Sequence, residues 1–219
     1  MKNSANKNIE HVFVLMLENR SFDHILGFSR IKRIDAENGN PTSINGLSGK
    51  EFNSYKNQQY SVLRGADYTM PFDPGHEFTD VVEQLCGEGT TYPNGGAYPK
   101  INNNGFVSNY ETTKSTGEDG ATGDFGEIMK CYDTKKQLPV MMSLAKQFAV
   151  CDNWFASLPG PTWPNRFFLH GASSAGLDHS RTTGEILAWE TVDGFDFPNH
   201  SIYKLMDNHK VTWRIYRGS

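Results

Sequence analysis

The first candidate for chemistry is a hydroxyl in a rigid loop. Residues 159–166 (PGPTWPNR) place Thr162 between prolines and just ahead of an apolar run. Pro164 suits the first turn of a helix, so we expect Thr162 at or beside a helix N-terminus, where free N–H groups and the helix dipole favour an anion. The position alone fits a plain helix cap, whereas the rigid surroundings favour a hydroxyl held for attack on phosphorus.

A threonine hydroxyl is a weak nucleophile and needs a nearby base or a metal ion. Glu18 and Asn19 supply oxygen ligands directly after the apolar residues 9–17 (IEHVFVLML), where an unpaired carboxylate would be costly. Such ligands suit one hard or borderline divalent ion, whose identity the sequence leaves open. Equally, Glu18 could pair with Arg20 or a helix N-terminus while Asn19 satisfies a turn.

His76 is the third candidate. It follows Asp73-Pro74-Gly75 and precedes residues 77–85, whose apolar spacing predicts an amphipathic helix. At that helix start His76 could donate to a phosphate oxygen or protonate a leaving group, or it could be a simple cap or turn residue. Histidines 170, 179, 200 and 209 have no i, i+4 partner of the zinc-protease type and are left unassigned.

The elements that would position these residues alternate between strands and helices. Residues 9–17 are nearly all apolar, which is typical of a central strand of a parallel sheet buried on both faces, and Ser21 can cap the helix that follows. The order repeats with a helix from Pro139 and a strand over residues 150–155. A helix over 201–206 and a strand over 211–216 come last. We therefore expect an α/β fold with a mostly parallel sheet flanked by helices.

Two long stretches interrupt this order. Residues 29–74 are polar and punctuated by Asn-Gly and Pro, which predicts an excursion with minor strands. The glycine-rich stretch at about 86–126 is long for a structureless loop in a compact domain, so it predicts a lid or substrate-facing insertion, with disorder as the alternative.

Composition excludes several classes of protein. The net charge of -4 gives no basic field to attract nucleic acid, and the longest apolar run is too short to span a membrane. The three cysteines lack C-x-x-C spacing, so we expect buried free thiols. Residues 1–8 carry no secretory signal, which makes the cytoplasm the default location.

At these residues the sequence resembles the bacterial phosphoesterase family that contains the non-specific phospholipases C and the respiratory-burst-inhibiting acid phosphatases, within the alkaline phosphatase superfamily. The matching segments are IEHVFVLMLENRSFDHILG, DPGHEFTDVVEQL and LPVMMSLAKQFAVCDNWFASLPGPTWPNRFFLHGASSAG. The last segment is long and specific.

The resemblance implies an alkaline-phosphatase-like fold and metal-dependent hydrolysis of a phosphate ester or a phospholipid. It implies that Glu18, Asn19 and Thr162 bind the metal, that Thr162 forms a covalent phospho-enzyme, and that His76 and Asn165 contact the phosphoryl group. It also makes secretion or the periplasm an alternative location. Phospholipase and phosphatase activity are not distinguished.

The resemblance covers nearly all of residues 1–219 but only the first half or so of the family's pattern. Members carry further metal-binding acidic residues and phosphate-contacting histidines downstream. We therefore expect the chain to be the N-terminal portion of one catalytic domain, incomplete at its C-terminus, which either works as part of a longer enzyme or is an inactive product that only binds phosphate or lipid head groups.

Overall fold

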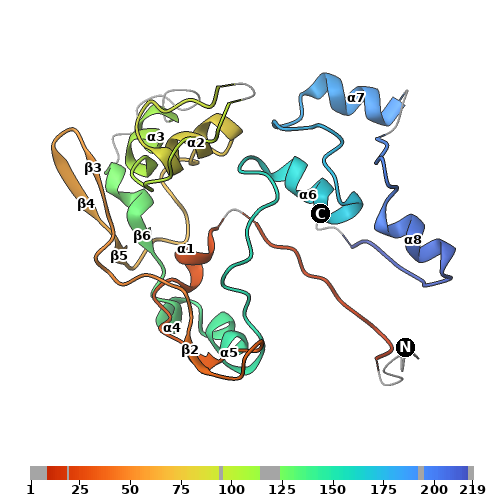
Figure 1. Cartoon of the computed structure of the whole chain (residues 1–219), viewed down its shortest axis with the longest axis horizontal. Coiled ribbons are helices and arrows are strands. Elements are labelled where there is room, and N and C mark those ends of the chain that lie inside the picture. Colours follow the sequence, from red (N-terminus) through yellow and green to blue (C-terminus); the bar gives the residue numbers. More distant parts are fainter. Residues whose placement is uncertain (1–8, 19, 94–95, 114–123, 192–194, 217–219) are drawn as a thin grey trace.

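The computed structural model of the chain describes residues 9–18, 20–93, 96–113, 124–191 and 195–216. Within these ranges the helices are α1 (Phe22–Leu26), α2 (Phe78–Cys86), α3 (Phe106–Thr113), the 3-10 helix η2 (Phe125–Met129), α4 (Thr134–Gln137), α5 (Pro139–Gln147), α6 (Thr162–Gly171), α7 (Thr183–Thr191) and α8 (Ile202–Asn208). The strands are β1 (Lys32–Ile34), β2 (Pro41–Ser43), β3 (Phe52–Tyr55), β4 (Gln58–Ser61), β5 (Leu63–Arg64) and β6 (Lys130–Cys131). Figure 1 shows α6 to α8 grouped apart from the other elements, with the segment after α5 joining the two groups.

The strands of the described ranges form small two-stranded sheets. β1 pairs with β2 and β3 with β4, both antiparallel, while β5 pairs with β6 in parallel. The β3–β4 hairpin turns through Lys56 and Asn57, whose φ angles of 48° and 61° are those of a tight type I′ turn. These hairpins fall in the polar stretch where minor strands were expected.

The fold is therefore mixed α/β, as expected, but the sheets of the described residues are small and mostly antiparallel, so the expected mostly parallel sheet is not seen there. The strands expected over residues 9–17, 150–155 and 211–216 are not formed in the described part of the chain. A strand needs a neighbour to bond its backbone N–H and C=O groups. No described segment lies in register beside any of these three.

Helices were predicted more successfully than strands. The helix expected over 77–85 is α2, which buries Val82 and Cys86 one turn apart, and the helix expected from Pro139 is α5, which buries Met142 and Ala145. Ser21 caps α1 by accepting a hydrogen bond from the His24 N–H at 3.1 Å. In the described ranges, no helix is long and apolar enough to cross a membrane.

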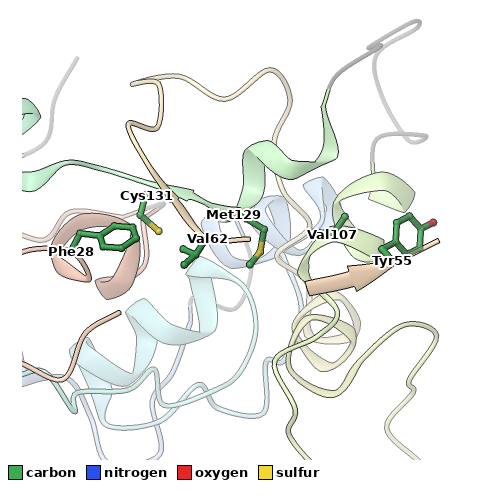
Figure 2. Close-up of a cluster of buried hydrophobic side chains, with 6 residues drawn as sticks. All are labelled: Phe28, Tyr55, Val62, Val107, Met129 and Cys131. Atoms are coloured by element: carbon green, nitrogen blue, oxygen red, sulfur yellow. The ribbon is translucent and has the colours of Figure 1, made fainter. Parts of the chain in front are cut away.

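Two clusters of buried side chains hold the group of elements before α6 together. In the larger, η2 and β6 pack against the β3–β4 hairpin and α3; its buried members, drawn in Figure 2, are Phe28, Tyr55, Val62, Val107, Met129 and Cys131. In the smaller, α1 packs against α5; its buried members are Leu26, Ile31, Met142 and Ala145.

The glycine-rich stretch contains part of this core. Its residues 106–113 form α3, whose Val107 and Tyr110 are almost inaccessible to solvent. Residues 94–95 and 114–123 lie outside the described residues. A lid role for the stretch stays a prediction.

The cysteines partly follow expectation. Cys86, Cys131 and Cys151 are all free thiols, and the first two are buried. Cys151 is exposed because it lies on residues 150–155, which have no partner strand.

Candidate functional site

Thr162 is the first residue of α6. The N-cap is Pro161, in extended conformation (φ -72°, ψ 174°), and its side chain makes no capping hydrogen bond. Thr162 is therefore the first helical residue and not the N-cap, and its half-buried side chain stands where first-turn N–H groups have no intrahelical partner. Its role as a nucleophile stays a prediction. Such a terminus attracts anions. Helix formation from Thr162 onward also confirms the prediction made from Pro164.

Asn165 ties the loop before α6 to the helix. Its Oδ1 accepts from the Leu158 N–H at 3.0 Å, and its Nδ2 donates to the carbonyls of Leu158 at 2.9 Å, Pro161 at 3.0 Å and Gly160 at 3.3 Å. The whole amide group is thus engaged in shaping the loop that leads to Thr162. A contact between Asn165 and a phosphoryl group stays a prediction.

Glu18 is joined to α6 by an ion pair. Its Oε2 lies 3.0 Å from Nη2 of Arg166 and accepts from Nε at 3.3 Å. Because residues four apart share one face of a helix, Arg166 lies on the same face of α6 as Thr162. The carboxylate expected to bind metal is therefore held beside the helix that carries the candidate nucleophile, by a partner that the sequence had not indicated.

Asn19 lies outside the described residues. Its neighbour Arg20, considered above as a partner for Glu18, instead donates from Nη2 to the Tyr68 carbonyl at 3.1 Å.

His76 stands at a helix start, as predicted. It precedes Glu77, the N-cap of α2, whose N–H donates to Asp80 Oδ2 at 3.0 Å in a capping box. The exposed imidazole has its Nδ1 3.2 Å from the Pro74 carbonyl oxygen and 3.9 Å from Asp73 Oδ2. Both of these contacts are made by Nδ1, and no hydrogen bond of Nε2 to another described residue accompanies them.

The start of α2 meets the loop before α6. A Cβ atom on Gly160 would lie 3.5 Å from the Cα of Phe78, an ordinary van der Waals contact. Glu77 Oε2 also accepts from the Ser180 N–H at 3.0 Å. Glu18 is therefore joined to α6 through Arg166, and the start of α2, beside His76, lies against the loop that leads into α6.

Two arginine side chains lie close to the start of α6. The guanidinium of Arg181 lies 3.4 Å from the ring centroid of Trp163, the residue after Thr162, in a cation–π contact. Burial, and secondarily the Arg166 guanidinium, lowers the pKa of His170 near the end of α6. The sequence analysis did not identify either arginine as a candidate site residue. The i, i+4 spacing of Thr162 and Arg166, which puts both on one helix face, could have indicated Arg166.

The donors fit a metal ion by type. Glu18 and Thr162 offer oxygen atoms, which hard divalent ions prefer, and the carboxylate already balances one cation, that of Arg166. Among the described residues, no group of three or more His, Cys, Asp or Glu side chains could hold a metal ion. A metal site here would need further ligands and a change in the Glu18–Arg166 pair.

The chain is similar to known proteins along almost its whole length. Residues 9–219 match the model of the phosphoesterase family. The chain is 33% identical to non-specific phospholipase C3 of Arabidopsis thaliana over 99% of its own length and 38% of the relative's. It is 39% identical to non-specific phospholipase C6 of the same plant, over 95% of this chain and 34% of the relative. A bacterial relative, the non-hemolytic phospholipase C of Burkholderia pseudomallei (strain K96243), is 27% identical over 96% of this chain and 26% of its own.

The chain thus spans little more than a third of the length of the plant relatives it matches. The match nevertheless extends through every segment that contributes to the candidate site, from Glu18 to Arg181. On this evidence the chain belongs to the phosphoesterase family.

Proposed function

We propose that this chain is the part of a phosphoric ester hydrolase that carries the nucleophile, and that the enzyme cleaves phospholipids in the manner of a phospholipase C or cleaves phosphomonoesters. The observation that carries the proposal is the position of Thr162, at the start of α6 with Arg166 and the Arg181–Trp163 pair around it. The phospholipase C names of the relatives support phosphate esters as the substrate class.

In this proposal the Thr162 oxygen attacks phosphorus, the bond from phosphorus to the leaving oxygen breaks, and the hydroxyl proton passes to a base. Water then attacks the phosphothreonine and releases phosphate or phosphocholine-type products. His76 protonates the leaving oxygen or donates to a phosphoryl oxygen from Nε2. The α6 N-terminus and the arginines balance the charge that develops on the phosphoryl oxygens.

We also propose that Glu18, Asn19 and Thr162 contribute to a site for one divalent ion. When bound, that ion would supply Lewis-acid stabilisation of the alkoxide and of the phosphoryl group. We further propose that the catalytically competent protein contains an alkaline-phosphatase-like, mostly parallel sheet. The strand-like composition of residues 9–17, 150–155 and 211–216 supports this fold.

The test compares this chain with a chimera that joins it to the unmatched part of the Arabidopsis non-specific phospholipase C6. Both are assayed on p-nitrophenyl phosphate and on phosphatidylcholine vesicles, with added divalent ions and with chelator. We expect turnover in the chimera, loss of turnover with chelator, and a decrease of at least about a thousandfold in kcat for Thr162→Ala. Thr42→Ala, an exposed threonine of β2, is the matched control.

Full turnover by Thr162→Ala, or no turnover by the chimera under any metal, would reject the mechanism.

The second candidate function is binding of phosphate or lipid head groups without hydrolysis. One observation favours it: Arg166 engages the Glu18 carboxylate, so a metal would have to displace or share that contact. Binding of inorganic phosphate that is insensitive to chelator, without turnover in any chain length, would support this second function.

A further inference from the structure

His76 is carried by a short turn at the surface. Residues 73–76 (DPGH) lie between Phe72 and the N-cap of α2, and both Asp73 and His76 are exposed to solvent. The imidazole is oriented from within the same turn, because its Nδ1 lies 3.2 Å from the Pro74 carbonyl oxygen. Contacts that hold the turn therefore hold both the imidazole and the carbonyl that orients it.

This turn packs closely against α2 and α3. A Cβ atom on Gly75 would overlap Thr113 Cγ2 and would lie 2.6 Å from Asp80 Cγ, so the approach requires a glycine. Just before the turn, the ring of Phe72 stacks on the buried ring of Tyr110, with 3.9 Å between the centroids, and the Tyr110 hydroxyl donates to the Phe72 carbonyl at 3.2 Å. Helix α3 therefore contacts both the turn and the residue that leads into it.

Asn109 of α3 is the centre of the polar contact between α3 and α2, which lie side by side in Figure 1. The residue is 2% exposed, and its Nδ2 donates to Asp80 Oδ1 at 3.0 Å and to Glu83 Oε2 at 3.4 Å. Its Oδ1 accepts from Gln84 Nε2 at 2.8 Å. An amide group both donates and accepts, so this one side chain joins carboxylates and a donor within a buried contact.

Two of the partners of this buried amide lead on to the backbone around His76. Asp80 Oδ2 accepts from the Glu77 N–H at 3.0 Å, and Gln84 Nε2 also donates to the Gly75 carbonyl at 2.7 Å. Gly75 and Glu77 flank His76 in the sequence. The backbone on each side of His76 is thus one side chain removed from the buried amide.

We propose that Asn109 is a positioning residue for His76, which it holds at the start of α2 through Asp80 and Gln84. The inference rests on the proposed function for the task of His76, and it gives the glycine-rich stretch, which contains α3, a part in the candidate site. A histidine that transfers a proton or donates to a phosphoryl oxygen has to lie within hydrogen-bond reach of its target, so displacement of the turn lowers the rate of that step.

Asn53 of β3 provides a matched control for this role. It is 1% exposed, its Nδ2 donates to the Asn103 carbonyl at 2.8 Å, and its Oδ1 accepts from the Val107 N–H at 3.2 Å. These hydrogen bonds hold the beginning of α3 and not the turn at residues 73–76. Loss of either amide leaves buried polar groups unpaired, so both alanine variants lose stability, but only Asn109→Ala should act on His76.

The first experiment is a double-mutant cycle in the chimera described above, on whichever of the two substrates it hydrolyses faster. We expect Asn109→Ala to lower kcat at least about tenfold and to leave KM within about threefold. In a His76→Ala background the same substitution should change kcat by less than about twofold, because the group that it positions is gone. Asn53→Ala should leave kcat within about twofold in both backgrounds. An equal loss from Asn109→Ala in both backgrounds, or an equal loss from Asn53→Ala, would overturn the inference.

The second experiment needs no turnover. In this chain labelled with 13C-histidine, the Cε1–H NMR signal of His76 is identified by its loss in His76→Gln. We expect the signal to move in Asn109→Ala toward the position of a histidine in a short peptide, and to stay in place in Asn53→Ala. Gln84→Ala, which removes the bond to the Gly75 carbonyl, should also move it and takes the place of Asn109→Ala if that variant does not fold. An unmoved signal in the folded variants would overturn the inference.

The two experiments separate this inference from the proposed function. A chimera without turnover would reject the function, and the His76 signal would still decide whether Asn109 holds the turn. Turnover that requires Thr162 but falls equally in Asn109→Ala with and without His76 would retain the function and reject the positioning role.

Discussion

Arg166, in the second turn of α6, holds Glu18 from 148 residues earlier in the chain, with 3.0 Å between Nη2 and Oε2. The pair joins the end of the apolar residues 9–17 to the helix of the candidate nucleophile. Both side chains are partly exposed, so water screens their attraction. We expect a double-mutant cycle of Glu18→Gln and Arg166→Gln to give a coupling of about 0.2–1 kcal/mol in urea unfolding. A coupling near zero would mean that the contact does not order the two segments in solution.

The same pair predicts how a divalent ion should bind. A metal that takes Glu18 as a ligand has to compete with the Arg166 guanidinium, so removing the guanidinium should tighten binding. We expect Arg166→Gln to raise the affinity for Ca²⁺ or Mg²⁺ by about two- to fivefold, the equivalent of the lost ion pair. Titration calorimetry measures this without any substrate. Arg181→Gln is the control, and weaker binding in Arg166→Gln would show instead that Arg166 orients the carboxylate toward the ion.

Asn165 should contribute to stability through the loop before α6. Asn165→Ala removes an amide that makes four hydrogen bonds to that loop, and it leaves partly buried backbone groups unpaired. We expect a loss of about 1–3 kcal/mol in the free energy of unfolding. Asn153→Ala, at an exposed asparagine with one hydrogen bond to Asn45, should cost less than about 1 kcal/mol. Equal losses would show that the loop is not held by Asn165.

Elements held by interactions between near neighbours in the sequence could be predicted, whereas elements that need a distant partner could not. The helices α2, α5 and α6 arise from local spacing, from Pro139 or Pro164 in a first turn, and from faces that bury one or two residues per turn. Residues 9–17 carry the composition of a buried strand, but a strand also requires a distant neighbour, which no local pattern supplies. The described protein gives it none.

The candidate site likewise divides into residues placed by local signals and contacts that depend on distant residues. Thr162 and His76 could be placed at helix starts because the signals lie within a few residues of each. The Glu18–Arg166 and Glu77–Ser180 contacts span 148 and 103 residues, so they depend on how segments far apart in the sequence come together. Sequence reasoning offered Arg20 as the partner of Glu18 because it weighed only neighbours along the chain.

The cysteines should differ sharply in reactivity. Burial, with nearby carboxylates as a smaller cause, raises the pKa of the Cys131 thiol to about 12, so almost no thiolate forms at neutral pH. Cys86 is buried as well, whereas Cys151 is exposed. We expect one fast thiol per chain in a titration with a disulfide reagent at pH 8, and none in Cys151→Ser. A second fast thiol in the native protein would contradict the burial of Cys86 or Cys131.

The start of α7 should respond to pH through His179. Its Nδ1 lies 3.0 Å from Asp178 Oδ1 and its Nε2 lies 3.0 Å from Glu185 Oε1, and these hydrogen bonds raise the pKa of the imidazole. A raised pKa means that folding favours the protonated ring, so the stabilisation is complete below the unfolded value of about 6.5 and disappears as the pH rises through the folded pKa. Glu185 also accepts from the Thr182 N–H and hydroxyl, which, with His179, lowers the pKa of its carboxyl and keeps it ionised throughout this range.

We therefore expect wild-type protein to exceed His179→Gln in stability at pH 5.5 and the difference to shrink toward zero by pH 9. Urea unfolding at several pH values measures the difference, and an NMR titration of the imidazole locates the folded pKa directly. His11→Gln, at an exposed histidine outside α7, is the matched control. A wild-type advantage that stays constant from pH 5.5 to 9 would show that His179 acts through neutral hydrogen bonds, because only the charged ring gives the predicted slope.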